Sequence, residues 1–194
     1  MKKILLLLSL SLCAVSSLRA QSGKESTSTG YFNLTQLLLC IGETEVGSIE
    51  QANMIPSVVN INGYRFSDHF SMGLGVGMTP SPYTTFPVFA DFRYTWLKSN
   101  LSPVIALKSG YSFAKNHKDV WGYGSQSNIK NIGGGMFNPE IGFKVAMSEG
   151  SDFLFTLGYW YQRIGSKADG YANRMYERQL NFNRLSFTIG FLFK

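Results

Sequence analysis

Charged residues, cysteines, histidines and long apolar runs are all scarce in this sequence. Charged side chains make up only 15% of the 194 residues, with two cysteines and two histidines. Beyond the N-terminal segment no run of 18 or more apolar residues occurs, so no transmembrane helix is expected. With so few His and Cys residues, the sequence has no cluster of side chains that could bind a metal ion. It predicts neither a metal site nor a cofactor.

The first 20 residues are typical of an export signal rather than of folded structure. Lys2 and Lys3 form a positive start, and the Leu-rich run 4–18 is nearly uncharged but short for a membrane span. We place cleavage after Ala20, although Leu18 is larger than the residue preferred at its position. We therefore expect a signal peptide at 1–20, a short polar segment at 21–29 and one folded domain at 30–194.

A lipoprotein is the competing interpretation of this N-terminus, because Cys13 follows Leu10 by three positions. Leu12 argues against it, since the residue before a lipidated cysteine is normally small. After cleavage only Cys40 remains, and a lone cysteine cannot form an internal disulfide. We expect Cys40 to be buried or to face lipid.

The net charge gives little support for nucleic-acid binding. Removing Lys2, Lys3 and Arg19 with the signal lowers the formal net charge from +6 to +3. Aromatic residues and glycine are instead abundant, with 15 Phe, 10 Tyr, 3 Trp and 20 Gly. This composition suits strands that border lipid, and nucleic acid is not an expected partner.

Apolar and polar residues alternate along six segments with the period of two that a β-strand requires. The C-terminal segment is the clearest, because Leu185, Phe187 and Ile189 alternate with Ser186 and Thr188. The six segments are 71–78, 86–97, 105–113, 137–147, 153–162 and 184–194. Two further strands, at 31–41 and 55–66, have no clean register, and a bulge at Gly63 is one explanation for the second. The total predicts about eight strands.

The polar face of these strands carries charges of both signs. Its charged members are Asp91, Arg93, Lys108, Glu140, Lys144 and Arg184. A barrel of eight strands is just wide enough to be filled by its own side chains, so we expect these charges to form a paired network in the lumen. A narrow ion path or a small polar ligand site is the alternative.

Short and long connections alternate strictly along the chain. The short links lie near 67–69, 98–102 and 148–151, whereas the long polar links lie near 42–53, 79–85, 115–133 and 163–178. Short turns on one rim and long loops on the other are typical of bacterial outer-membrane barrels, whose short turns face the periplasm. Aromatic residues in the long links are the candidates for contact with external partners: Trp121, Tyr123, Tyr171 and Tyr176.

The signal, the alternating strands and the ending of the chain together resemble the small outer-membrane β-barrel families of Gram-negative bacteria. In those families an apolar alternation with Gly and a terminal aromatic is presented to the insertion machinery, which here implies roles for Gly190, Phe191 and Phe193. Lys194 departs from the usual terminal aromatic. The resemblance implies an all-β, up-and-down antiparallel transmembrane barrel in the cell outer membrane, in contact with membrane lipid, lipopolysaccharide and the insertion machinery.

The function that these patterns favour is non-enzymatic, with a filled lumen and exposed loops in a structural or surface-interaction role. A lipid A-modifying enzyme is the first alternative, because His69 and Ser71 are two residues apart and an imidazole can activate a hydroxyl. The topology places His69 in a periplasmic turn, away from such a substrate, and His117 lies in a long loop. A narrow pore for small solutes is the second alternative.

Overall fold

The structure is a computed structural model of the chain. It describes residues 29–46, 49–80, 84–96, 100–115, 117–121, 125–148, 150–169 and 175–194. The predicted export signal and residues 21–28 of the polar segment lie outside this part. Within the described residues, no helix is long and apolar enough to cross a membrane.

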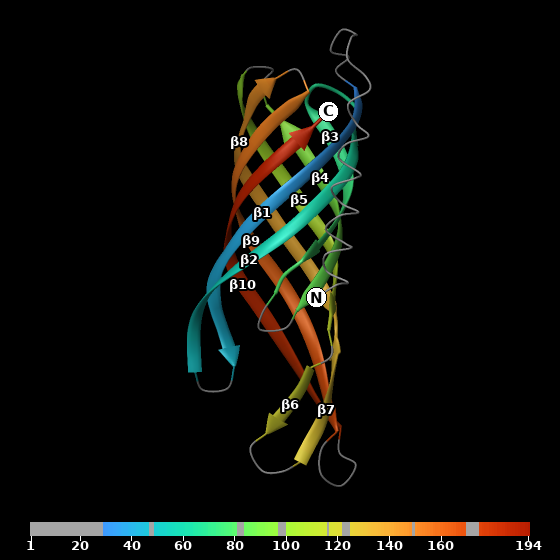
Figure 1. The fold of residues 1–194 in the computed structure, drawn as a ribbon, viewed down its shortest axis with the longest axis vertical. Helices are drawn as coiled ribbons and strands as arrows, with labels where there is room; N and C mark the ends of the chain where they lie inside the picture. Colours follow the sequence, from blue (N-terminus) through green and yellow to red (C-terminus); the bar gives the residue numbers. More distant parts are fainter. Residues whose placement is uncertain are drawn as a thin grey trace, which may run out of the picture.

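The described chain forms ten β-strands. Their bounds are β1 Gly30–Val46, β2 Ile49–Arg65, β3 Phe70–Met78, β4 Thr85–Thr95, β5 Leu101–Ala114, β6 His117–Trp121, β7 Ser125–Ile132, β8 Gly134–Ser148, β9 Ser151–Asp169 and β10 Met175–Phe193. Eight of them, β1 to β5 and β8 to β10, make a closed antiparallel barrel of tilted strands (Figure 1).

Closure depends on the pairing of the first strand with the last. Antiparallel pairs join β1 to β10 from Asn33 opposite Phe193 to Glu43 opposite Asn183. A sheet closed in this way has no free edge, so its backbone N–H and C=O groups are satisfied without water. The fold predicted from the alternating segments, an eight-stranded up-and-down barrel, is confirmed.

Side chains alternate between the lumen and the exterior along most of each strand. β4 shows this alternation from end to end, and β10 repeats it from Gln179 onward. Most of the exposed side chains in the belt are apolar or aromatic, as at Leu74, Ile141 and Leu185, whereas charged residues such as Lys108 and Glu140 are buried. A soluble barrel has the opposite arrangement, so this exterior fits a surrounding of lipid.

β1 and β2, whose faces the sequence leaves ambiguous, are regular strands in the structure. Leu38 and Cys40 point into the barrel and are buried, while Leu37 points outward. The pairing of β2 runs without interruption through Gly63, which lies opposite Phe32 on β1 and Gly73 on β3. The suggested bulge at Gly63 is therefore wrong, because β2 keeps one register: Val59 and Ile61 point into the lumen, while Asn62 points outward.

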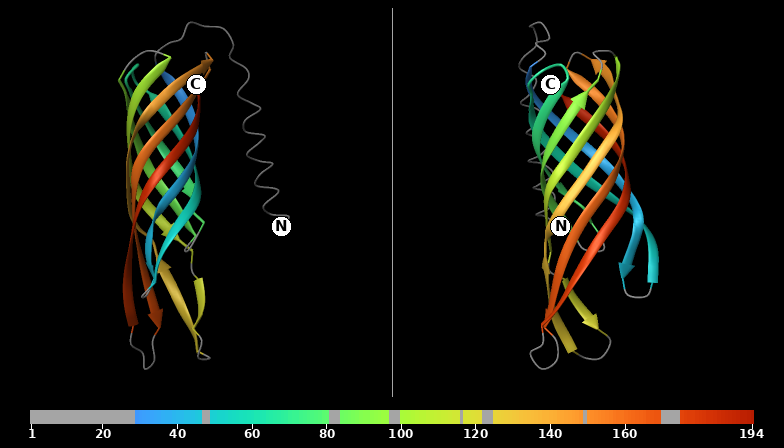
Figure 2. Two further views of the ribbon diagram at one scale, coloured as in Figure 1. Left: turned by 90° about the vertical axis from the view of Figure 1, so that its left-hand side faces the viewer. Right: turned by 180° about the vertical axis from the view of Figure 1, so that it is seen from behind.

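The long links are shorter than expected because the strands extend into them. β1, β2, β9 and β10 continue through most of 42–53 and 163–178. In the link 115–133, β6 and β7 form a hairpin whose register continues that of β5 and β8, since Ser112 opposite Gly134 is followed by His117 opposite Ile129. These ends project as β-ribbons from one rim (Figure 2). Hydropathy alternation marks only the apolar belt, whereas backbone pairing persists beyond it.

Exposed aromatic side chains gather at both ends of the apolar belt. Phe66, Phe70, Tyr94 and Trp96 form contacting ring pairs beside the short turns, at the end that holds the C-terminus. The other end has Phe86, Tyr111, Phe113, Phe137 and Tyr159 on its outer surface. Amphipathic and aromatic rings are favoured at the two interfaces of a membrane, and this placement matches the expectation from sequence.

The glycines of β3 give a first prediction. A Cβ on Gly75 would overlap the ring of Phe89 and approach Ile61 Cγ1 to 3.0 Å, whereas a Cβ on Gly135 meets nothing within 4 Å. Gly75→Ala should therefore lower the free energy of unfolding by ~1–3 kcal/mol, as overpacking of a filled interior does. Urea unfolding of the protein in lipid vesicles measures the change. Gly135→Ala is the control, and equal effects of the two variants would contradict the assignment.

Candidate functional site: the barrel lumen

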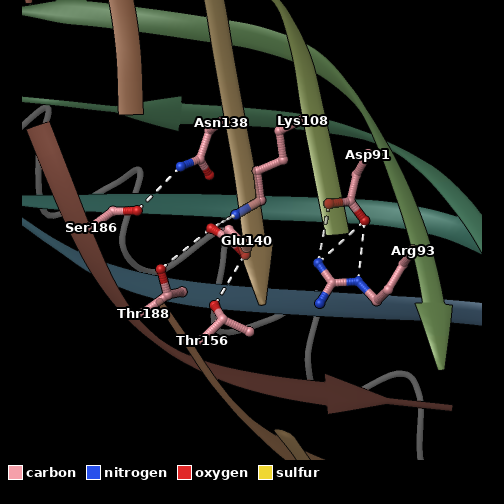
Figure 3. Close-up of polar contacts among 8 residues, drawn as sticks. All are labelled: Asp91, Arg93, Lys108, Asn138, Glu140, Thr156, Ser186 and Thr188. Carbon is pink, nitrogen blue, oxygen red and sulfur yellow. Dashed lines mark hydrogen bonds and ion pairs between the residues drawn. The ribbon is translucent and has the colours of Figure 1, made fainter. Parts of the chain in front are cut away.

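Five strands bring polar side chains together in the middle of the lumen. Strand pairing sets Asp91 opposite Lys108 on β4 and β5, and Lys108 opposite Asn138 on β8. Thr156 on β9 lies opposite Thr188 on β10. Because directly opposed residues share a face of the sheet, all of these side chains point inward. Figure 3 shows how they converge.

The carboxylate of Glu140 is the centre of this network. Lys108 Nζ donates a hydrogen bond to Glu140 Oε1, and both side chains are completely buried. Thr156 Oγ1 donates to Glu140 Oε2 at 3.0 Å, and Thr188 Oγ1 donates to Oε1 at 3.4 Å. A buried charge is tolerated when it is both paired and hydrogen-bonded, and Glu140 meets both conditions.

A second ion pair lies one strand away on β4. Arg93 Nη2 lies 3.1 Å from Asp91 Oδ1, and Arg93 Nε donates to Asp91 Oδ2 at 3.3 Å. The guanidinium therefore binds both carboxylate oxygens, a geometry that fixes its orientation. Asp91, Arg93, Lys108 and Glu140 together carry no net charge.

Gly158 provides the space in which the network fits. A Cβ at this position would lie 2.8 Å from Glu140 Cγ and 2.8 Å from Ser186 Oγ. Ser186 in turn accepts a hydrogen bond of 3.1 Å from Asn138 Nδ2. A side chain at residue 158 would push both polar groups out of their positions.

Apolar side chains fill a large part of the lumen beside the polar ones. One buried cluster consists of Phe32, Leu34, Leu38, Cys40, Val59, Ile61, Phe89, Val104, Met136, Leu154, Trp160 and Leu192. Leu154 and Trp160 are large apolar residues on the face of 153–162 that also carries Thr156 and Gln162, and both are fully buried inside. A narrow barrel excludes bulk water, so large apolar residues pack in it as they do in a protein core.

Two of the six predicted lumen charges lie apart from the network. Lys144 is near the rim of short turns, where its Nζ lies 4.0 Å from Asp152 Oδ2. Arg184 is buried toward the other end, with its guanidinium carbon 4.6 Å from the centre of the Phe182 ring. Among the side chains that the structure describes, no carboxylate pairs with it, and its Nε has no hydrogen-bond partner.

Asp152 is a lumen residue that sequence reasoning missed. Its carboxylate is buried and accepts a hydrogen bond of 2.8 Å from Lys194 Nζ, while Lys194 N donates to Gly150 O. The ion pair holds the C-terminus against β9. Asp152 alternates with Leu154 and Thr156 on one face of the strand, and this pattern could have placed it in the lumen. Its partners Lys194 and Lys144 are 42 and eight residues away in sequence.

The residues considered for an enzyme do not assemble in the structure. His69 lies in a turn at the short-turn rim, where its Nδ1 is 2.8 Å from Thr95 O and its ring stacks on Tyr94. Ser71 is buried on the inner face of β3. Across the residues that the structure describes, no group of three His, Cys, Asp or Glu side chains could hold a metal ion.

The remaining predicted residues lie at the two ends of the barrel. Phe191 and Phe193 are exposed near the short-turn rim, and Phe191 packs on Phe153 with ring centres 4.3 Å apart. Gly190 faces inward against Leu34 and Gln36. Trp121 lies in β6 and Tyr176 in β10, though without described side chains, whereas Tyr123 and Tyr171 lie outside the described residues.

An apolar exterior, a filled lumen and closure between first and last strands define the class of small eight-stranded transmembrane β-barrels of the outer-membrane type. No protein-family model matches the sequence, and no curated protein matches it.

Solved structures share the fold. Neisserial surface protein A is similar at a TM-score of 0.60 and 14% identity, covering 87% of this chain and 99% of its own. The outer-membrane protein OprG from Pseudomonas aeruginosa gives 0.57 and 14%, covering 84% and 95%. The outer-membrane protein AlkL gives 0.54 and 11%, covering 90% and 93%. At such identities the likeness concerns the fold.

The buried Lys108 and Glu140 pair gives a second prediction. Removing one partner, as in Lys108→Met or Glu140→Gln, leaves a buried charge uncompensated and should lower the free energy of unfolding by ~3–5 kcal/mol. The double variant should lose much less than the sum of the two. Urea unfolding in vesicles measures this coupling.

Lys194→Ala is the matched control, because it breaks an ion pair whose lysine side chain is 29% exposed. Its cost should be ~1 kcal/mol, because Lys144 Nζ, 4.0 Å from the Asp152 carboxylate, still offsets that buried charge. Strictly additive losses in the Lys108 and Glu140 variants would show that the two charges do not act as a pair.

Proposed function

We propose that this protein is a non-enzymatic barrel of the cell outer membrane, closed to solutes, that acts through the β-ribbons on its outer rim. The observation that carries the proposal is the closure of the lumen: Trp160, Phe32 and Lys108 are among its largest fully buried side chains. The projecting ribbons are then the parts available to partners outside the cell, and Trp121, Tyr123, Tyr171 and Tyr176 are the candidate contacts.

The burial of the lumen charges argues against a pore. A water-filled path would leave its charged lining accessible, yet Arg93 and Glu140 are each 3% exposed and Arg184 is 2% exposed. The three residues lie on different strands around the barrel, so low exposure at all three indicates a closed interior rather than a local constriction. The lumen network of Asp91, Arg93, Lys108, Glu140, Lys144 and Arg184 is accordingly proposed to be structural.

An enzymatic role has less support than a structural one. A lipid A-modifying site needs its catalytic residues near the outer leaflet, whereas His69 binds a backbone carbonyl at the opposite rim. The similar solved structures bear the names of outer-membrane proteins and of a surface protein, without an enzyme among the three described above.

Insertion and lipid contact follow from the same proposal. The exposed Phe191 and Phe193 end the last strand at the short-turn rim, and together with Gly190 they are the proposed signal for the insertion machinery. Membrane lipid surrounds the apolar belt, and lipopolysaccharide is the proposed neighbour of the projecting ribbons. The orientation places the short turns in the periplasm.

Conductance across planar lipid bilayers tests the closed lumen. The native protein should give no steady ion current, whereas Trp160→Ala, which removes the largest buried side chain, should raise the current above that baseline. Phe155→Ala is the control because its side chain is exposed on the outer wall. Steady conduction by the native protein would overturn the proposal of a closed barrel.

Epitope insertion on intact bacteria tests the orientation. A tag placed between β6 and β7 should be detected by antibody on intact cells, because this hairpin lies at the rim of the projecting ribbons. A tag between β4 and β5 should be detected only after the outer membrane is permeabilised. The reverse pattern would place the ribbons in the periplasm and remove the basis for an external contact role.

A further inference from the structure

A group of uncharged polar side chains interrupts the apolar outer wall on β1 and β2. It consists of Tyr31, Asn33, Thr35, Asn60 and Asn62, which we call the amide cluster. Asn33 lies opposite Asn62, and Thr35 opposite Asn60, so all four share the outward face with Tyr31. Three carboxamides therefore lie side by side on a surface that is otherwise built for lipid.

Hydrogen bonds join the members of the amide cluster to one another. Asn33 Nδ2 donates to Asn62 Oδ1 at 2.8 Å, Asn60 Nδ2 to Thr35 Oγ1 at 2.9 Å, and Asn62 Nδ2 to Asn60 Oδ1 at 2.9 Å. The Tyr31 hydroxyl also donates to Asn62 Oδ1. Each carboxamide has two N–H donors, so the single bond from Asn62 Nδ2 leaves one donor to spare.

The strands on both sides of the amide cluster are apolar at the same register. Asn33 and Thr35 lie opposite Phe193 and Phe191 on β10. On the other side, Asn62 and Asn60 lie opposite Leu74 and Val76 on β3. These four flanking side chains are exposed. The amide cluster is thus a polar strip between two apolar surfaces, one on β10 and one on β3.

The amide cluster extends deeper than an interfacial position explains. Asn60 lies four residues beyond the rim tyrosine Tyr64, which places it roughly 10 Å further along the membrane normal for a tilted strand. At the other rim, the Tyr159 hydroxyl donates a hydrogen bond to Asn183, and the Tyr161 hydroxyl donates one to Asn181. Polar groups inside the hydrocarbon layer are costly unless they are hydrogen-bonded, so the spare donor of the amide cluster favours a further polar partner.

We propose that the amide cluster is the contact surface for a second copy of this chain in the membrane. Carboxamides both donate and accept, so a strip of them without charge is complementary to itself across a two-fold axis. The flanking Phe191 and Phe193 on one side and Leu74 and Val76 on the other exclude lipid and water from the contact. The proposal depends on the outer wall lying in a bilayer, as the proposed function requires.

Disulfide cross-linking in membranes tests this contact. Single cysteines at the three asparagines, Asn33→Cys, Asn60→Cys and Asn62→Cys, place thiols on the strip, while the native Cys40 is buried in the lumen and does not interfere. At least one of the three should give a disulfide-linked dimer on mild oxidation. Ile141→Cys on the wall formed by β8 is the control, because its side chain is 63% exposed to the same lipid.

Replacement of the amides separates association from folding. Asn60→Leu with Asn62→Leu should weaken association of the barrel in vesicles about tenfold, as expected for the loss of two polar contacts. Energy transfer between labelled copies measures the association. The same double variant should keep its heat-modifiable migration on gels and its β circular dichroism, because leucine suits a lipid-facing site.

The outcomes distinguish this proposal from the proposed function. Cross-linking at the control position as efficiently as at the asparagines, no cross-linking at any asparagine, or unchanged association of the leucine variant would each overturn the dimer. In those cases heat-modifiable migration of the same samples would still support the membrane barrel. Loss of that migration in the native protein would overturn the barrel itself.

Discussion

The need to satisfy every backbone N–H and C=O group without water governs this structure. Lipid offers these groups no partner, so a β-sheet can cross a membrane only if its first and last strands meet. The pairing of β1 with β10 closes the sheet. Once it is closed, the period of two along each strand divides the chain into one set of side chains for lipid and one for the lumen.

Closure with eight strands also fixes how much the lumen can hold. An interior of eight strands is just wide enough to be filled by side chains, and charged and apolar residues share it here. Without water in the lumen, the Glu140 carboxylate takes its three hydrogen bonds from Lys108, Thr156 and Thr188. The apolar cluster around Trp160 needs no such partners. Gly158 and Gly75 leave the gaps into which larger neighbours fit.

Alternation in the sequence was enough to predict the fold. It worked for β4 and β10, where each face has its own character, and in the structure Asp91, Lys108 and Glu140 are buried. It failed for β1, because the run 37–41 is apolar on both faces and only the pairing with β10 decides that Leu38 points inward.

Features made by residues far apart in sequence were beyond this reasoning. Asp152 binds Lys194 only because the barrel brings the start of β9 to the end of β10. Asn33 and Asn62 meet for a similar reason, through the register of β1 and β2. The sequence analysis also missed that β9 and β10 extend into 163–178. Backbone pairing outside the membrane does not need the alternation of apolar and polar residues that predicts a strand in lipid.

The continuous register between the barrel and its projecting hairpin has a mechanical consequence. β5 and β8 carry Lys108 and Glu140, the register of β6 with β7 is in phase with that of β5 with β8, and β7 also pairs with β9. A force applied to the tip of the hairpin is therefore passed to β5 and β8 along the chain and to β9 through backbone hydrogen bonds. Two of these three strands hold the buried ion pair, so that pulling on the hairpin loads a contact inside the lumen.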